Sequence, residues 1–374
     1  MTEKPDSDII IIGGGIGGSA ATLRAVQNGM QASWITGSKQ SRIRSRSQWV
    51  KHLDNMIGFH EDVIKDQVVT ALERHKLSDA ADFIGGQHYH INNRMIIKNT
   101  VKRLRANYAG WITFIDADAT GLSAHDGSFT VTAAGQHYAA PAVVLATGIM
   151  DEQPQFKVRD KHGQPLTTPR PIYPFANYES ALYCIRCEGH LTRNDSVAVI
   201  GRSQSAAQVA FMFHERYGNR VFLLGNGQAP DLSSELEQVC QAYGIVIIPD
   251  LITDFISADV GELCGVVFDG HPDIKVRFAT IMMGTHRAYN DLARQVGAKL
   301  VDENKAPETS QIIIDHRGQT SVRGLFAVGD IAWREDEPMM KQVYTAQEYA
   351  VRAVDSIDSR RRTVMRKKRV NSLT

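Results

Sequence analysis

A strand, a glycine-rich turn and a helix follow one another near the start of the chain, and this order constrains the fold more than any other feature. The apolar run DIIII at 8–12 precedes Gly13, Gly15 and Gly18, which have the spacing GxGxxG. A helical pattern then continues to about Gly29, and the strand-like ASWIT follows. Glycines at these positions allow the tight turn, the approach of a pyrophosphate and the packing of helix on strand. The sequence therefore predicts a dinucleotide-binding βαβ unit.

A second unit of the same kind begins in the middle of the chain. SVAVIG at 196–201 has the pattern of a buried strand, AQVAFMF that of a helix and RVFLL that of the next strand. The proline-rich segment from Pro154 to Pro174 separates the two units and is the expected crossing between domains. A chain of 374 residues has room for two domains. The predicted fold class is α/β, with two Rossmann-like domains.

The C-terminal part contains a buried strand pattern, GLFAVGD at 324–330, followed by a helical pattern to Asp358. The last segment, 359–374, is strongly basic and has little apolar content. Such runs are usually solvated, so we expect a solvated or disordered end, with an anionic partner as the alternative.

Composition excludes several classes of function. The net charge is +1 and 22% of the residues are charged, which argues against a dedicated nucleic-acid binder. No apolar run approaches the roughly 20 residues that span a bilayer, and the polar start MTEKPDSD has no signal-peptide core. The sequence thus predicts a cytoplasmic protein without a nucleic-acid or membrane partner.

A pair of cysteines with CxxC spacing is the strongest chemical signal. Cys184 and Cys187 lie in LYCIRCEGH, next to Glu188. This spacing allows a small disulfide ring and commonly lowers the pKa of one thiol, and an adjacent carboxyl group can supply a proton. Half of a zinc site and inert burial are the alternatives; Cys240 and Cys264 are isolated, so no second CxxC exists. We predict no metal site.

The order of these motifs resembles the low-molecular-weight thioredoxin reductases. The matching pieces are GGGIGG, WITG, NMIGF at 55–59, LATG at 145–148, YCIRCEG just ahead of the second nucleotide turn, and GLFAVGD followed by MKQVYTAQEYA. The resemblance covers nearly the whole chain. It implies three-layer ββα Rossmann-like domains of the pyridine nucleotide-disulfide oxidoreductase type, with an FAD domain at 1–154 and 286–358 and a central domain at 155–285. It also implies a homodimer.

The resemblance implies roles for individual residues around FAD. The three glycines of the first turn would hold the pyrophosphate, Asp330 would accept a hydrogen bond from the flavin's sugar-alcohol chain, and Lys341-Gln342-Val343 matches a segment whose backbone lies against the flavin ring. The predicted FAD contacts are Gly13, Gly15, Gly18, Thr36, Thr147, Gly148, Gly329, Asp330, Lys341, Gln342 and Val343.

The same resemblance assigns the catalytic residues. Cys187 would be the flavin-facing sulfur, Cys184 would attack the disulfide of a thioredoxin-like protein or a small molecule, and Glu188 would be the acid, where the family usually has aspartate. The implied activity is two-electron exchange between FAD and the dithiol.

The second nucleotide turn departs from the family pattern. The family has GxGxxA, whereas this chain has GRSQSA at 201–206, so Ser203 replaces the second glycine. No Lys or Arg occurs from Val221 through Ile274, where cationic partners of a 2′-phosphate would be expected, and the strand RVFLL is not followed by an acid for a ribose. These features argue against ordinary NADPH or NADH use.

Two further segments are candidate binding elements. The family's glycine-rich loop beside the flavin is replaced by SKQSRIRSRSQWVKH, whose cations are Arg42, Arg44, Arg46 and Lys51. A solvated loop is the simpler interpretation, and a docking surface for an acidic, ferredoxin-like electron donor or for an anionic ligand is the alternative. His88 and His90 alternate as in a strand and are interpreted as a surface feature rather than as metal ligands.

Two other functions remain open at the level of sequence. One is a dithiol oxidase that passes electrons from the flavin to oxygen. The other is a flavin redox sensor or binding module without turnover. Peroxide production from a dithiol identifies the first, and a function in cells that survives Cys187→Ser identifies the second.

Overall fold

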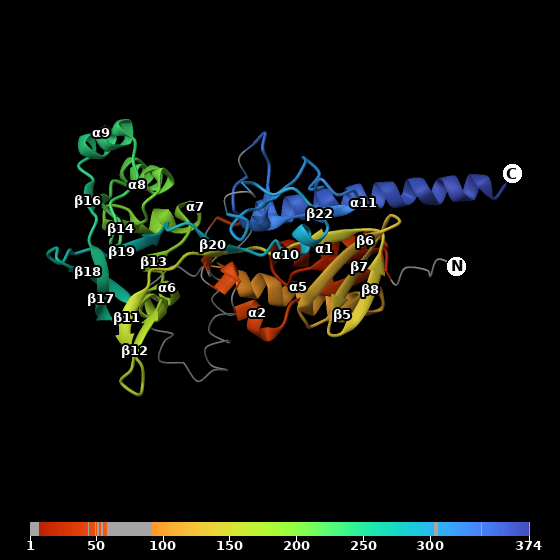
Figure 1. The fold of residues 1–374 in the computed structure, drawn as a ribbon, viewed down its shortest axis with the longest axis horizontal. Coiled ribbons are helices and arrows are strands. Elements are labelled where there is room, and N and C mark those ends of the chain that lie inside the picture. The colour runs from red at the N-terminus through yellow and green to blue at the C-terminus, as the bar shows by residue number, and fades with distance from the viewer. Residues whose placement is uncertain are drawn as a thin grey trace. The chain divides into compact units, whose positions relative to one another are not determined.

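The computed structural model describes residues 7–43, 45–48, 50, 52–53, 55–57, 91–302, 306–337 and 339–373 (Figure 1). The chain forms two compact units, each built from separate stretches: 1–48, 94–150 and 285–374 make the first, and 49–93 and 151–284 make the second. Several residues that the sequence singled out lie outside the described residues, namely Arg44, Lys51, Gly58, Phe59, His88 and His90.

A five-stranded sheet forms the centre of the first unit. Neighbouring strands pair in parallel in the order β22 (Leu325–Ala327), β9 (Val143–Leu145), β1 (Ile9–Ile12), β2 (Ala32–Ile35) and β5 (Ile112–Ile115). All four isoleucines of β1 are buried, because a central strand of a parallel sheet is covered on both faces. This explains why the sequence shows an unbroken apolar run rather than an alternation.

Helices and an antiparallel meander complete the first unit. The meander, β6 (Ala119–His125), β7 (Ser128–Ala133) and β8 (Gln136–Ala140), shares one apolar core with the parallel sheet. The remaining elements are α1 (Ile16–Gln27), α2 (Lys39–Ile43), η1 (Arg46–Gln48), α5 (Asn93–Asn107), η2 (Ala109–Trp111), β10 (Ile149–Asp151), β20 (Thr285–Ala288), α10 (Asp291–Gln295), β21 (Ile312–Ile313), η5 (Gly329–Ile331), β23 (Ala332–Trp333) and α11 (Val343–Asn371).

Hydrogen bonds around Asp355 join α1 to α11. Arg24 donates from Nε to Oδ1 at 2.6 Å and from Nη2 to Oδ2 at 2.9 Å, and Asn28 Nδ2 donates to Oδ1 at 2.9 Å. Burial alone would raise the pKa of Asp355, but the hydrogen bonds from Arg24 and Asn28 and the charge of Arg24 outweigh it, so the pKa is lowered. The charged carboxylate therefore stabilises the folded unit.

Replacing Asp355 with asparagine is expected to lower the free energy of unfolding at neutral pH by about 1 kcal/mol, because the pair is partly exposed and screened. A lowered pKa means that the stabilisation is present above the unfolded-state value of about 3.9 and is lost as the pH falls through the folded-state value. Urea unfolding of both proteins at about pH 7 and about pH 3 measures the difference. A difference that stays the same at the two pH values would contradict the ion pair.

The expectation that the last segment is disordered and that the helix ends at Asp358 is wrong. α11 continues to Asn371, although the side chains from 362 to 373 are exposed, as expected for a solvated end (Figure 1). Contacts past Asp358 carry the helix onward: Arg362 Nε donates to Asp358 Oδ2 at 2.7 Å, and Arg361 Nε lies 3.2 Å from Asp8 Oδ1. The i,i+4 pair and the basic, helix-favouring residues explain the extension.

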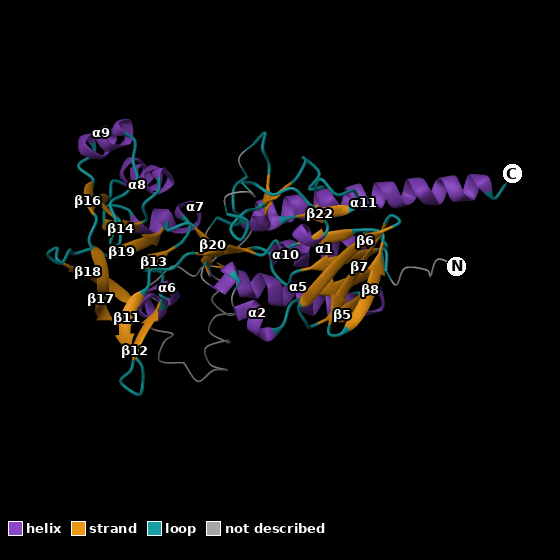
Figure 2. Ribbon diagram, viewed as in Figure 1, coloured by secondary structure: helices purple, strands orange, loops and turns teal. Residues whose placement is uncertain are grey.

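The second unit has its own five-stranded parallel sheet (Figure 2). Its order is β13 (Ala181–Leu182), β19 (Phe278–Ile281), β14 (Ser196–Ile200), β15 (Arg220–Leu224) and β16 (Val246–Ile248). The other elements are β3 (His52–Leu53), β4 (Ile91–Asn92), β11 (Phe156–Arg159), β12 (Pro165–Thr168), η3 (Arg170–Ile172), α6 (Tyr173–Asn177), α7 (Ile185–Glu188), η4 (Gly189–Thr192), α8 (Gln204–Tyr217), α9 (Ser234–Ala242), β17 (Leu251–Asp259) and β18 (Glu262–Asp269). Two parallel sheets confirm the predicted α/β class.

The proline-rich segment expected to be a plain crossing is part of the second unit. It contains the hairpin β11–β12 and the short helices η3 and α6. Phe156 and Phe175 each pack against Phe255, with ring centroids 5.3 Å and 5.4 Å apart. These aromatic contacts fold the segment onto β17. The boundary between the two units falls at 150/151, just ahead of this segment.

Within the described residues, no helix is both long enough and apolar enough to cross a bilayer.

Candidate functional site

The first glycine turn has open space for a phosphate at Gly15, whereas Gly13 and Gly18 have no space for a side chain. Gly13 has a φ of +126°, and a Cβ on it would lie 2.1 Å from Ala146 O. A Cβ on Gly18 would lie 1.8 Å from Gly13 O, whereas a Cβ on Gly15 would have nothing within 4 Å. Gly15 is also the N-cap of α1, so the open space lies where the helix presents backbone N–H groups. The turn therefore fits a pyrophosphate.

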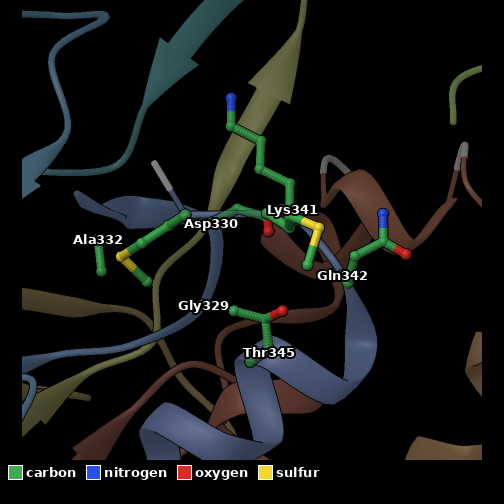
Figure 3. Close-up of a pocket in the computed structure, with 9 residues that line it drawn as sticks. Gly329, Asp330, Ala332, Lys341, Gln342 and Thr345 are labelled. Atoms are coloured by element: carbon green, nitrogen blue, oxygen red, sulfur yellow. The ribbon is translucent and has the colours of Figure 1, made fainter. Parts of the chain in front are cut away.

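Four predicted FAD residues line one pocket at the start of α11. Gly329, Asp330, Lys341 and Gln342 line it together with Thr345 (Figure 3). Val343, the first residue of α11, is buried and follows Gln342 directly. Residues far apart in the sequence thus meet in this part of the first unit, and their polar groups suit contacts with a flavin.

Thr147 and Gly148 are held at the end of β9. Thr147 Oγ1 donates to Tyr289 O at 2.6 Å, and Gly148 O accepts from Tyr289 N at 3.2 Å. Gly148 has a φ of +72° and open space at its Cβ position. These two residues are not among those that line the pocket at α11.

Residues that sequence reasoning missed surround Thr36 at the end of β2. Thr36 Oγ1 donates to Asp116 Oδ1 at 2.6 Å, and Arg42 Nη1 donates to Thr36 Oγ1 at 3.1 Å and lies 3.2 Å from Asp116 Oδ1. The hydrogen bond from Thr36, with the charge of Arg42, lowers the pKa of Asp116. An acidic side chain from the residue after β5 thus lies at the end of β2. The feature of the sequence that could have indicated this acid is the stretch DAD at 116–118, which directly follows the strand ITFI.

The two cysteines of CxxC form a disulfide at the start of α7. Cys187 is 3% exposed, whereas Cys184 is only half-buried. Asn55 Nδ2 lies 3.9 Å from Cys187 Sγ and 3.5 Å from Arg186 O. Asn55 begins the NMIGF segment, so the structure places the first residue of that motif near the buried sulfur.

Buried polar groups surround the disulfide. Glu188 ends α7 and is 5% exposed, and its backbone N–H donates to Cys184 O at 3.0 Å. Tyr183 donates its hydroxyl to Gln153 Oε1 at 2.6 Å. Burial, with the nearby charge of Asp151, raises the pKa of Tyr183 well above its ordinary value, so the phenol stays neutral. Cys184, Cys187 and Glu188 are therefore held on one short helix. In the described part of the chain, no group of three or more His, Cys, Asp or Glu side chains is placed to hold a metal ion.

In the second nucleotide turn, the side chain of Ser203 lies at the N-terminus of α8. A Cβ on Gly201 would lie 2.4 Å from Met282 O, so the first glycine keeps its role in the tight turn. Ser203 is the N-cap of α8, and its Oγ accepts from Ala206 N at 3.3 Å. The serine thus places a hydroxyl group at the N-terminus of the helix, where the pyrophosphate of a dinucleotide would lie.

Hydrogen bonds join the loop after β14 to the loop after β15. Asp231 N donates to Arg202 O at 2.8 Å, and Arg202 Nη1 donates to Gln228 Oε1 at 2.6 Å. Gly225 makes the tight bend, since a Cβ on it would lie 1.8 Å from Gln228 O. The ends of these two strands are where a Rossmann fold binds the pyrophosphate and ribose of a nucleotide. Here that space is bridged by the protein's own groups.

Two parallel dinucleotide-type sheets, an open glycine turn and a CxxC disulfide define the class of protein: a nucleotide-dependent disulfide oxidoreductase. The chain belongs to the pyridine nucleotide-disulphide oxidoreductase family, which it matches over residues 7–350. This confirms the family that the order of the motifs indicated.

Individual relatives are distant. The F subunit of alkyl hydroperoxide reductase from Pseudomonas aeruginosa is 20% identical over 336 residues, which cover 88% of this chain and 54% of the relative. The protein of the same name from Xanthomonas campestris pv. phaseoli is 22% identical over 335 residues, which cover 88% of this chain and 53% of the relative. The chain spans about half the length of these curated relatives.

Among solved structures, the thioredoxin reductase from Streptococcus pyogenes superposes with a TM-score of 0.70 at 16% identity, covering 94% of this chain and 96% of that one. The thioredoxin reductase from Giardia duodenalis gives a TM-score of 0.69 at 15% identity, covering 95% of this chain and 99% of that one. These similarities establish a shared fold, which confirms the predicted two-domain architecture.

Proposed function

We propose that this protein is a flavin-dependent thiol-disulfide oxidoreductase that exchanges two electrons between FAD and the Cys184/Cys187 pair and reduces thioredoxin or a similar disulfide. The observation that carries the proposal is the CxxC disulfide on α7, directly ahead of β14, in a chain of this family. FAD supplies two-electron chemistry when it is bound. The proposed FAD domain is 1–154 and 286–358, and the proposed central domain is 155–285.

The unequal burial of the two sulfurs supports their separate roles. After two electrons and two protons convert the disulfide to a dithiol, the more exposed Cys184 attacks one sulfur of the partner disulfide and releases the other as a thiol. Cys187 then attacks Cys184 in the mixed disulfide, which frees the second partner thiol and re-forms the internal disulfide. Glu188, buried beside them, would move the protons these steps require.

Direct use of a nicotinamide cofactor is not part of the proposal. The Ser203 cap and the bridge from Arg202 to Gln228 and Asp231 support this, because they use the backbone and side-chain groups that a dinucleotide would need. A ferredoxin-like protein is the proposed alternative donor. Arg42 and Arg46 from the basic segment are each paired with a carboxylate, so docking would depend on other cations of the surface.

Anaerobic titration of the yellow protein with NADPH, then NADH, then dithionite is expected to bleach the flavin only at the last step. An NADPH-dependent thioredoxin reductase titrated in parallel shows that the assay responds. Bleaching by one equivalent of NADPH within seconds would overturn the proposal about the donor, while leaving the disulfide chemistry in place.

The closed nucleotide turn also favours a second candidate, a dithiol oxidase. If no nicotinamide reduces the flavin, a dithiol substrate can supply the electrons through Cys184 and Cys187, and oxygen can accept them as peroxide. Steady peroxide formation with a dithiol in air would select this direction. A redox sensor without turnover is the remaining alternative, and a function in cells that survives Cys187→Ser would select it.

We infer the setting from the same family resemblance. The resemblance implies a homodimer in the cytoplasm, with a thioredoxin-like protein or a small disulfide as the oxidant. Sedimentation of the FAD-loaded protein measures the oligomeric state.

A further inference from the structure

An arginine from the basic segment reaches the wall of the flavin pocket. Arg46 begins the short helix η1, and its Nη1 lies 3.1 Å from Asp330 Oδ2. The exposed fractions of the two side chains are 16% and 22%, so water screens this pair less than a fully exposed pair. The contact joins residues 284 positions apart. It depends on the segment that replaces the glycine-rich loop of similar proteins.

Asp330 is fixed by its backbone and keeps one carboxylate oxygen available. Gln311 Nε2 donates to Asp330 O at 2.6 Å and to Ala332 O at 3.2 Å, which holds the turn that follows β22. Among the described residues, the side-chain contact of Asp330 is made through Oδ2 to Arg46. Within the described residues, Oδ1 makes no such contact, and Asp330 is one of the residues that line the pocket.

We propose that Arg46 is a positioning residue for FAD, which neutralises Asp330 and orients its carboxylate so that an anionic dinucleotide can bind over it. The inference rests on the proposed function, because it takes FAD as the occupant of the pocket. The motifs that carry the family resemblance assign this arginine no contact with FAD.

Charge balance supplies the physical reason. FAD carries two negative charges on its pyrophosphate, and a half-buried carboxylate without a partner would repel it. The ion pair removes that repulsion while leaving Oδ1 as an acceptor for a hydroxyl of the sugar-alcohol chain. Removing Arg46 alone leaves the negative charge of Asp330 without a partner, whereas removing both charges leaves no unpaired charge at either position. The two residues should therefore be energetically coupled.

A double-mutant cycle on FAD affinity tests this coupling. We expect Arg46→Ala to raise the Kd for FAD about 10-fold or more, Asp330→Asn to raise it by about 3-fold or less, and the double variant to fall close to Asp330→Asn. FAD binding is measured by the quenching of flavin fluorescence on FAD-free protein. Circular dichroism of the same samples reports whether the fold survives.

Arg352→Ala is the matched control, because Arg352 also pairs with a carboxylate in the first unit but lies exposed on α11, 2.5 Å from Glu348 Oε1. Its Kd for FAD should equal that of the unchanged protein. An unchanged Kd in Arg46→Ala, or single effects that simply multiply in the double variant, would overturn the inference. A protein that binds no FAD at all would instead overturn the proposed function, and the inference with it.

Discussion

Replacing Cys187 with serine is expected to lower turnover with a small disulfide such as 5,5′-dithiobis(2-nitrobenzoate) by at least about 10³-fold, the scale of losing a nucleophile in a coupled catalytic group. Cys184 is only partly buried, so in this variant it can still attack the reagent. With no Cys187 to resolve the mixed disulfide, the reaction stops after one event. Absorbance of the released thiolate should show one equivalent per chain and then no further rise.

Two matched variants give this result its meaning. Cys184→Ser should release much less thiolate at first, because Cys187 is 3% exposed and is shielded from the reagent. Cys264→Ser removes a partly buried free thiol from the same unit and should turn over normally. If Cys187→Ser kept multiple turnovers, the assignment of the two sulfurs would be wrong and the sensor hypothesis would gain support.

Features that depend on short stretches of sequence were predicted from the sequence. The first glycine turn needs a strand, three glycines and a helix within 8–29, and the structure shows each glycine where a side chain would clash or would fill open space. The CxxC pair is equally local, because three residues of separation place the two sulfurs on one turn of α7. Such local patterns determine the arrangement of their residues without contacts from distant parts of the chain.

Contacts that the fold creates were not predicted. Thr36 meets Asp116 because β2 and β5 are parallel neighbours, with Ile35 beside Ile115, and no local pattern reveals that pairing. Arg46 likewise meets Asp330, 284 positions away in the sequence, through the tertiary fold and not through a local pattern. The serine in the second glycine turn is visible in the sequence, but its function as a helix cap depends on backbone geometry that only the structure shows.

The end of α11 illustrates a different limit. The composition of the basic segment correctly indicated solvent exposure, yet it could not show that Asp8 would accept Arg361 and so extend the helix. In an isolated basic segment, intrinsic helix propensity decides whether a helix forms. In the folded protein, one tertiary contact near the start of the segment favours the helical state of the residues that follow.

Replacing Gly15 with valine is expected to raise the Kd for FAD by at least about 100-fold while leaving the FAD-free fold nearly intact. A Cβ at Gly15 has nothing within 4 Å in the FAD-free protein, so the new side chain meets no protein atom near its base and instead fills the space of the pyrophosphate. Loss of the glycine N-cap costs about 1 kcal/mol or less. The 450 nm to 280 nm absorbance ratio after loading measures occupancy, and urea unfolding measures stability.

Two other glycines separate this effect from damage to the fold. Gly110→Val places the same side chain on the surface, where a Cβ also has nothing within 4 Å, and should change neither FAD occupancy nor stability. Gly18→Ala should lower both, because its Cβ would stand 1.8 Å from Gly13 O and force the turn apart. Full FAD occupancy in Gly15→Val would mean that the cofactor's phosphates do not lie at this turn. The flavin site would then have to be sought elsewhere, even though the pocket at α11 is intact.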